Sequence, residues 1–228
     1  ESVLFLRPAF GQPADGTLLL RPDRVLAVRS ASGQVQYEPE RDFVVAAASR
    51  RLLLPPGSRI PWIERADLYR RAGQADGIDH LAGDPQTRLL FGEGRYFHDL
   101  QTAVTYAPAE AWPGAAPAAD PEVLPGTRRK LAAAAPLRVC LSGDSISAGA
   151  NASGCTGAPP YLPFYGELVV HRLSQRYGSP ACFHNLAVGG RGAAHGVEVA
   201  AAAAAWRPAL ILVAYGMTAV GRRDPETV

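Results

Sequence analysis

Three short apolar runs in the second half of the sequence alternate with segments of helical periodicity, and this alternation restricts the fold more than any other feature. The runs lie at residues 137–141, 181–188 and 209–215. Helical spacing of apolar residues occupies about residues 162–177, and an alanine-rich helical segment follows at about 193–206. Alternating strands and helices form βαβ units, so the pattern predicts an α/β fold with a parallel sheet. The third run is continuously apolar, which predicts a strand buried on both faces.

The first half of the sequence differs, because its apolar runs are short and are broken by turn residues at 32–33, 55–57 and 92–94. The expected strands lie at residues 24–28, 35–37, 43–46, 52–54 and 102–106. Short strands at this spacing predict a β-sandwich of the jelly-roll kind. An alanine- and proline-rich stretch over residues 107–125 then predicts a semi-rigid linker. We therefore expect a β domain over residues 1–125 and an α/β domain over residues 126–228.

Composition and charge exclude several classes of protein. Of the 228 residues, 47% are hydrophobic and 19% are charged, as in ordinary globular proteins, which argues against disorder. The formal charge is +2 and basic residues are scattered, so we expect no nucleic-acid partner and a small or neutral substrate. No apolar run reaches the roughly 18 residues that cross a bilayer, so no membrane partner is expected. The sequence starts at Glu1 without methionine and leaves both a cytoplasmic and a secreted location open.

The cysteines are Cys140, Cys155 and Cys182, an odd number without the spacing of metal ligands. Three free thiols are expected, and a bridge between Cys155 and Cys182 is the alternative. No metal site is predicted.

Each apolar run of the α/β half is followed by a turn that contains glycine. The carboxyl ends of parallel strands lie at one edge of a sheet, so these turns should meet there. Ser145 follows the first run in such a turn, where its hydroxyl is exposed and its own N–H can donate to a reacting carbonyl. Gly190 follows the second run, and its N–H can approach a ligand closely because it lacks a side chain. Together they predict acyl transfer, with Ser145 as nucleophile and Gly190 as a second oxyanion donor.

These turns resemble motifs of the SGNH (GDSL-type) hydrolase superfamily. Residues 143–145 (Gly-Asp-Ser) are similar to the first block of the family, and residues 185–190 (Asn-Leu-Ala-Val-Gly-Gly) are similar to the second. The resemblance implies a flavodoxin-like parallel-sheet hydrolase domain with Ser145 as the catalytic serine. Residues 216–218 resemble the third block, in which an asparagine donates to the oxyanion, but this sequence has Thr218 there. The Thr218 hydroxyl can act as the third oxyanion donor with one hydrogen bond, although it is shorter and differently aimed than an asparagine side chain. Loss of one such donor typically costs about 100- to 1000-fold in turnover.

The resemblance extends to the front of the chain. Residues 96–106 and 124–127 look like segments that precede the hydrolase domain in bacterial two-domain members, whose front domain is a jelly roll. The fourth block of the family, an aspartate with a histidine three residues later, does not occur before Val228. We therefore expect an apparently truncated hydrolase domain. Its activity alone should be low, because a triad that lacks one member retains only about 1000- to 10,000-fold catalysis over water.

Several side chains near Ser145 are candidates for contact with substrate, namely Asp144, Asn185 and Arg191. For Asp144, a helix N-cap that accepts local N–H groups is favoured. For Asn185, a brace for the nucleophile turn is favoured. Arg191 would meet an anionic substrate group or form a surface salt bridge. His195 begins the second helical segment, and a solvated helix histidine is expected there rather than a catalytic base.

Two hypotheses follow from these residues. The first is a serine esterase that removes acetyl or other short acyl groups from carbohydrate or a related hydroxylated compound, with no metal or organic cofactor. The second is a catalytically degenerate glycan-binding or scaffolding protein, motivated by Thr218 and by the missing histidine.

Overall fold

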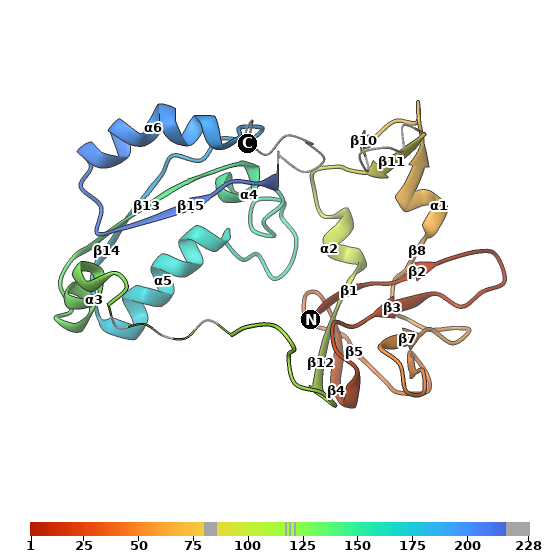
Figure 1. Ribbon diagram of the computed structural model, residues 1–228. Helices are drawn as coiled ribbons and strands as arrows, with labels where there is room; N and C mark the ends of the chain where they lie inside the picture. The colour runs from red at the N-terminus through yellow and green to blue at the C-terminus, as the bar shows by residue number, and fades with distance from the viewer. Residues whose placement is uncertain (80–85, 117, 119, 121, 218–228) are drawn as a thin grey trace. The chain divides into compact units, whose positions relative to one another are not determined.

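The computed structural model describes residues 1–79, 86–116, 118, 120 and 122–217, and Figure 1 shows its helices and strands. The chain divides into two compact units. The first comprises Glu1–Ala115 with Thr156–Pro160, and the second comprises Ala116–Cys155 with Tyr161–Val228. The fold is mixed α/β with several sheets, one of them parallel, so the predicted class is confirmed at this level.

The first unit is built mainly of short strands. An antiparallel four-stranded sheet has the order β1 (Ser2–Leu4), β12 (Gln101–Pro108), β4 (Pro22–Ser30), β5 (Gln36–Tyr37). A five-stranded sheet has the order β6 (Val44–Val45), β7 (Arg51–Leu53), β3 (Asp15–Thr17), β2 (Leu6–Arg7), β8 (Ile63–Glu64), with β2 and β8 parallel. A three-stranded sheet has the order β10 (Gly77–Asp79), β11 (Thr87–Leu90), β9 (Tyr69–Arg71). The helices α1 (Arg65–Leu68) and α2 (Tyr96–Leu100) are short.

Side chains from the four-stranded and five-stranded sheets share one hydrophobic core. Val3 of β1, Val28 of β4 and Val104 of β12 are buried in the same cluster as Leu52 of β7. Gly16 of β3 permits this close packing, because an added Cβ would overlap the side chain of Val3. The two sheets are therefore held together by burial of their apolar faces.

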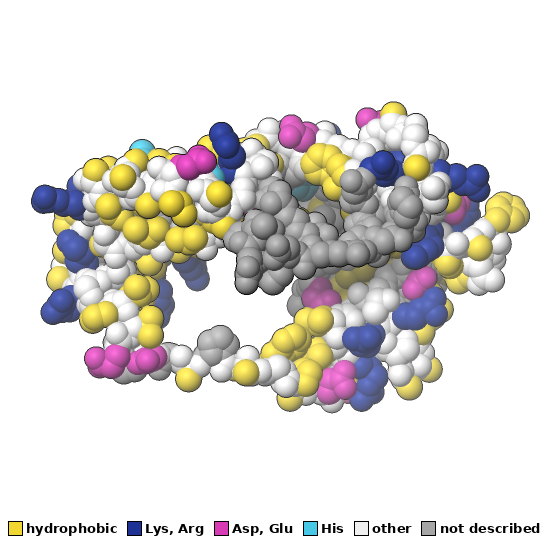
Figure 2. Space-filling view, turned by 45° about the horizontal axis from the view of Figure 1, so that its top comes forward, with side chains coloured by type: hydrophobic (Ala, Val, Ile, Leu, Met, Phe, Trp, Pro, Cys, Tyr) yellow, Lys and Arg dark blue, Asp and Glu magenta, His cyan; other side chains and the backbone are white. Residues whose placement is uncertain are grey.

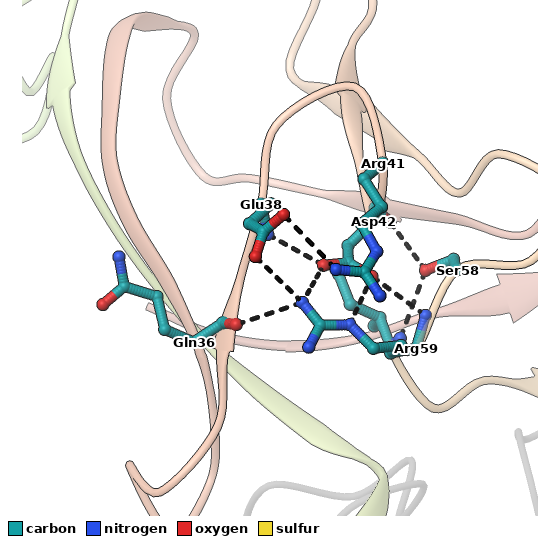
Figure 3. Close-up of polar contacts among 7 residues, drawn as sticks. Gln36, Glu38, Arg41, Asp42, Ser58 and Arg59 are labelled. Carbon is teal, nitrogen blue, oxygen red and sulfur yellow. Dashed lines mark hydrogen bonds and ion pairs between the residues drawn. The ribbon is translucent and has the colours of Figure 1, made fainter.

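A buried ion pair joins two loops of the first unit (Figure 3). Asp42 is fully buried, and its carboxylate accepts hydrogen bonds from Arg59 Nε at 3.0 Å and Arg59 Nη2 at 2.5 Å. It also accepts from the backbone N–H groups of Glu38 at 2.8 Å and Arg59 at 3.1 Å. The hydrogen bonds from the Arg59 guanidinium hold the pKa of Asp42 well below its usual range. Ser58 Oγ donates to the Asp42 carbonyl at 2.6 Å, so both the backbone and the side chain of residue 42 are anchored.

Between β12 and helix α3 (Pro125–Ala132), residues 109–116, 118, 120 and 122–124 form no helix or strand. This stretch lies within the alanine- and proline-rich segment that the sequence predicts as a linker. Helix α3 itself was not predicted, and it begins at a proline in its first turn, where the missing N–H is not needed for a helical hydrogen bond.

The second unit contains the parallel sheet, with the order β14 (Ala181–Asn185), β13 (Leu137–Gly143), β15 (Leu210–Ala214). Its other helices are α4 (Ser145–Ala148), α5 (Tyr165–Tyr177) and α6 (Ala193–Ala205). Figure 1 shows α6 on one face of the sheet and α5 with α3 on the other. Helix α5 lies close to the sheet at Gly166, where an added Cβ would lie 2.7 Å from Leu141 Cδ2.

The prediction that the third strand is buried on both faces is wrong. In β15, Ile211 is 45% exposed and Val213 is 72% exposed. Burial is found in the central strand β13 instead, where Val139, Cys140 and Leu141 are fully buried. The difference arises because β15 is the outermost strand of the described sheet, and helix α6 packs against β13.

Candidate active site

The turns that follow the parallel strands are joined by hydrogen bonds at the carboxyl edge of the sheet. The N–H of Val188, after β14, donates to the carbonyl of Gly143 at 3.1 Å. The N–H of Asp144, after β13, donates to the carbonyl of Ala214 in β15 at 3.3 Å. The chain leaves β13 to form β14 on one side and β15 on the other. In open α/β sheets, ligands bind outside the carboxyl ends of the strands at such a reversal of strand order.

Ser145 is the first residue of helix α4 and follows the central strand after one intervening residue. Its N–H occupies a position that has no intrahelical partner in an α-helix. Ser145 is half-buried, and its hydroxyl has no hydrogen-bond partner among the described residues. Ser145 therefore lies partly exposed at the end of a buried strand, with a hydroxyl that is unpaired among the described residues.

Asp144 positions this turn and is itself buried, with 3% of its surface exposed. One carboxylate oxygen accepts from the N–H of Ile146 at 3.1 Å, which is the N-cap arrangement that the sequence predicts. The other oxygen accepts from the N–H of Met217 at 3.2 Å, beyond the end of β15. Asp144 thus ties the serine turn to the neighbouring strand, and both oxygens are occupied by backbone groups.

The glycine turn after β14 lies beside the serine. A Cβ added to Gly189 would lie 3.7 Å from Ser145 Cβ, so the two turns are in contact. Gly190 has φ +76, a left-handed conformation that favours glycine, and an added Cβ would have nothing within 4 Å. The N–H of Gly190 has no hydrogen-bond partner within the part of the chain that the structure describes. The open side of Gly190 and its unpaired donor suit an approaching ligand oxygen.

Gly143 and Ser147 make the tight junction between strand β13 and helix α4. A Cβ on Gly143 would lie 2.6 Å from the Ala214 carbonyl oxygen and would also overlap Ser147. Ser147 Oγ forms a hydrogen bond with the hydroxyl of Tyr165 at 2.7 Å, which links α4 to α5. The position of Ser145 therefore depends on a glycine immediately before the turn.

Asn185, the last residue of β14, braces the serine helix. Its Nδ2 donates to the carbonyl of Ser147 at 2.9 Å, and its Oδ1 accepts from the N–H of Ala187 at 2.9 Å. Arg191 is exposed two residues after Gly189. Thr218, predicted as the third oxyanion donor, lies outside the described residues.

His195 is not the solvated histidine that the sequence predicts. It is buried with 8% exposure, and its Nε2 lies 3.1 Å from the Leu186 carbonyl oxygen. Its Nδ1 lies 3.3 Å from Glu198 Oε2, so both ring nitrogens have partners. The prediction failed because the ring at the start of α6 turns toward the sheet, where a backbone carbonyl needs a donor. Among the described residues, no histidine forms a hydrogen bond with the Ser145 hydroxyl.

Two hydroxyl pairs near the site, Ser142 with Tyr215 and Ser147 with Tyr165, were missed in the sequence. Ser142 Oγ and Tyr215 Oη lie 2.7 Å apart and link the ends of β13 and β15. The ring of Tyr215 contacts helix α6 at Gly196, where an added Cβ would lie 3.1 Å from Tyr215 Cε2. A serine directly after the apolar run Val139–Leu141 was the available signal, because a buried hydroxyl requires a partner.

Three apolar side chains are exposed next to these turns. Ile146 is 45% exposed, Val188 is 44% exposed and Met217 is 58% exposed. Ile146 adjoins Ser145, Val188 precedes the two glycines, and the N–H of Met217 is bound to Asp144. The surroundings of the serine hydroxyl are therefore partly apolar.

On the face shown in Figure 2, Lys and Arg side chains are interspersed with Asp and Glu. All three cysteines are free thiols, and burial raises the pKa of Cys140. The described residues contain no group of metal-ligating side chains. No helix within the described part of the chain has the length and hydrophobicity of a transmembrane helix.

Comparison with protein-family models, with curated proteins and with solved structures gave no match to this chain.

Proposed function

We propose that the second unit is a serine ester hydrolase of the SGNH type, in which Ser145 attacks the substrate. The observation that carries the proposal is the contact between two turns: Ser145 begins α4, and a Cβ added to Gly189 would lie 3.7 Å from Ser145 Cβ. The strand order β14, β13, β15 fits the beginning of a flavodoxin-like sheet. In this proposal the first unit is a jelly-roll-like β-sandwich that accompanies the hydrolase.

In the proposed reaction, Ser145 Oγ forms a bond to the carbonyl carbon of the ester, and its proton passes to a base. The carbonyl oxygen becomes anionic and accepts hydrogen bonds from the N–H groups of Ser145 and Gly190. Thr218 is proposed as a third donor. Collapse of the tetrahedral intermediate breaks the bond to the alcohol, which leaves with the proton. Water then attacks the acyl-serine and releases the carboxylic acid.

Asp144 and Asn185 are positioning residues in this proposal, because their side chains form hydrogen bonds with backbone groups of the neighbouring turns. They are not proposed to contact the substrate. The exposed side chains of Ile146, Val188 and Met217 favour an acyl group that is short and apolar, such as acetyl. The proposed alcohol is a carbohydrate or a similar hydroxylated compound. Arg191 is exposed and is proposed to meet an anionic group of the substrate.

Reaction with a fluorophosphonate tests the nucleophile directly. Ser145 Oγ would bond to phosphorus and displace fluoride, and the modified peptide would be mapped by mass spectrometry on the intact gene product. We expect the label on Ser145 and no label in Ser145→Ala. Mapping must separate Ser145 from Ser142 and Ser147, which serve as internal controls because their hydroxyls are buried and hydrogen bonded. Absence of label at Ser145 would reject the proposal.

The second candidate is a catalytically degenerate glycan-binding or scaffolding protein. The occupied nitrogens of His195 favour it, since no described residue supplies a base to the Ser145 hydroxyl. Hydrolysis of p-nitrophenyl acetate by the intact gene product, lost in Ser145→Ala, would exclude this candidate. Saturable saccharide binding without hydrolysis would support it.

A further inference from the structure

A groove in the first unit has a size and lining suited to a small ligand. Its volume is about 570 Å³, within the range of about 300 to 1,000 Å³ that is usual for small-molecule sites. It is formed by the loop between β2 and β3, by the turn after β7 and by Trp62. Gly11 and Gly57 form open bends on these two loops, with φ +79 and φ +82.

Trp62 and Arg7 form an ordered aromatic and polar surface in this groove. The Arg7 guanidinium carbon lies 4.3 Å from the centroid of the Trp62 ring, and the guanidinium also forms an ion pair with Glu64. Arg7 and Glu64 face each other in the parallel pairing of β2 with β8. The orientation of Arg7 is therefore set by the stacked ring and by the ion pair together, while Trp62 remains 38% exposed.

Two polar groups of the groove lack partners. Arg7 Nε is buried and has no hydrogen-bond partner among the described residues. This atom is covered by protein, so the part of Arg7 that a ligand can meet is the 27% of its side chain that is exposed. The Gln12 side chain is exposed and has no hydrogen-bond partner in the described part of the chain. It can offer both a donor and an acceptor.

The charge of the groove points to a neutral ligand. Arg7 is the only charged residue among the described residues that line it, and Glu64 neutralises that charge. The remaining lining is apolar or uncharged, including Pro13, Pro55 and Pro56. A ligand with flat apolar faces and several hydroxyl groups matches a lining of one indole ring, several proline rings and one side-chain amide.

We propose that this groove binds a neutral saccharide, whose ring face packs against Trp62 and whose hydroxyls bond to the Gln12 side chain. The site is separate from Ser145 and does not depend on the ester hydrolase proposed above. In an esterase acting on carbohydrate it would hold the polymer near the protein, and in a protein without activity it would be the binding site itself.

The test is a fluorescence titration of the full chain with cellohexaose, xylohexaose and chitohexaose, together with tri-galacturonic acid and a decaproline peptide. We expect saturable binding of at least one neutral hexasaccharide that changes tryptophan emission. Trp62→Ala and Gln12→Ala should each weaken that binding, the former by tenfold or more. The controls are Trp112→Phe, which changes an exposed tryptophan outside the groove, and Ser145→Ala.

Each other outcome overturns the proposal. These outcomes are no binding of any neutral hexasaccharide, preference for the acidic sugar or for decaproline, and binding lost in Ser145→Ala but kept in Trp62→Ala. The last result would place the saccharide at the serine. Circular dichroism verifies that each variant folds. If Trp62→Ala does not fold, the saccharide affinities of Gln12→Ala and Trp62→Phe take its place in the test. Failure of the fluorophosphonate label would leave this result unaffected, so the two proposals fail separately.

Discussion

Replacement of Asp42 by asparagine should destabilise the first unit strongly, although it changes few atoms. Asp42 is fully buried and uses both oxygens as acceptors from Arg59 and from the backbone of Glu38. Asparagine removes the negative charge and turns one acceptor into an NH2 donor that faces other donors. Arg59 then keeps its charge without its closest counterion.

The expected cost follows from the burial of the two partners. Breaking a buried ion pair by removing one partner costs about 3 to 5 kcal/mol. The Arg59 side chain is 37% exposed, so water can replace part of the lost interaction and the lower end applies. We therefore expect the free energy of unfolding to fall by about 3 kcal/mol at pH 7.

The pH dependence has a definite sign. The pKa of Asp42 is lowered in the folded state, so its contribution is fully present above the pKa of an unfolded aspartate, about 3.9, and declines as the pH falls below it. The asparagine variant has no group to titrate there. The difference in stability between wild type and variant should be largest near neutral pH and should shrink below about pH 4.

Urea unfolding followed by tryptophan fluorescence measures this difference. In a Trp206→Phe background the remaining tryptophans, Trp62 and Trp112, both belong to the first unit. Glu38→Gln is the matched control, because it removes one negative charge from the same cluster at a side chain that is 60% exposed. It should cost less than about 1 kcal/mol. Equal costs for the two variants, or a pH-independent cost for Asp42→Asn, would refute the reasoning.

Two substitutions and one thiol titration test the second unit. Gly143→Ala should destabilise the second unit by at least about 2 kcal/mol in urea unfolding, because the new Cβ would lie 2.6 Å from the Ala214 carbonyl oxygen. Unchanged stability would contradict the tight junction between β13 and α4. Asp144→Asn should slow fluorophosphonate labelling of Ser145 and lower the free energy of unfolding by about 1 to 3 kcal/mol, because the N–H of Ile146 or of Met217 loses its acceptor. Labelling at the wild-type rate would contradict the positioning role of Asp144. In a thiol titration with Ellman's reagent, Cys155 and Cys182 should react in the folded protein and Cys140 only after unfolding, because Cys140 is buried; rapid reaction of all three would contradict this.

The first unit was less predictable than the second. Its longest strands, β4 and β12, contain the predicted runs, whereas β3 (Asp-Gly-Thr) carries no apolar pattern to detect. Such a strand exists because its neighbours β2 and β7 pair with it. The pairing of Asp42 with Arg59 was equally hidden, since it depends on two loops meeting in space.

The sequence by itself determined the features that depend on neighbours within a few residues. The alternation of strands and helices in the second unit, the placement of Ser145 after the central strand, and the capping by Asp144 all follow from local periodicity and side-chain chemistry. Only the tertiary structure decided which turns meet, because contacts between distant segments depend on strand order. The bond from Met217 to Asp144, the approach of Gly189 to Ser145, the burial of His195 and the exposure of Val213 all belong to that second group.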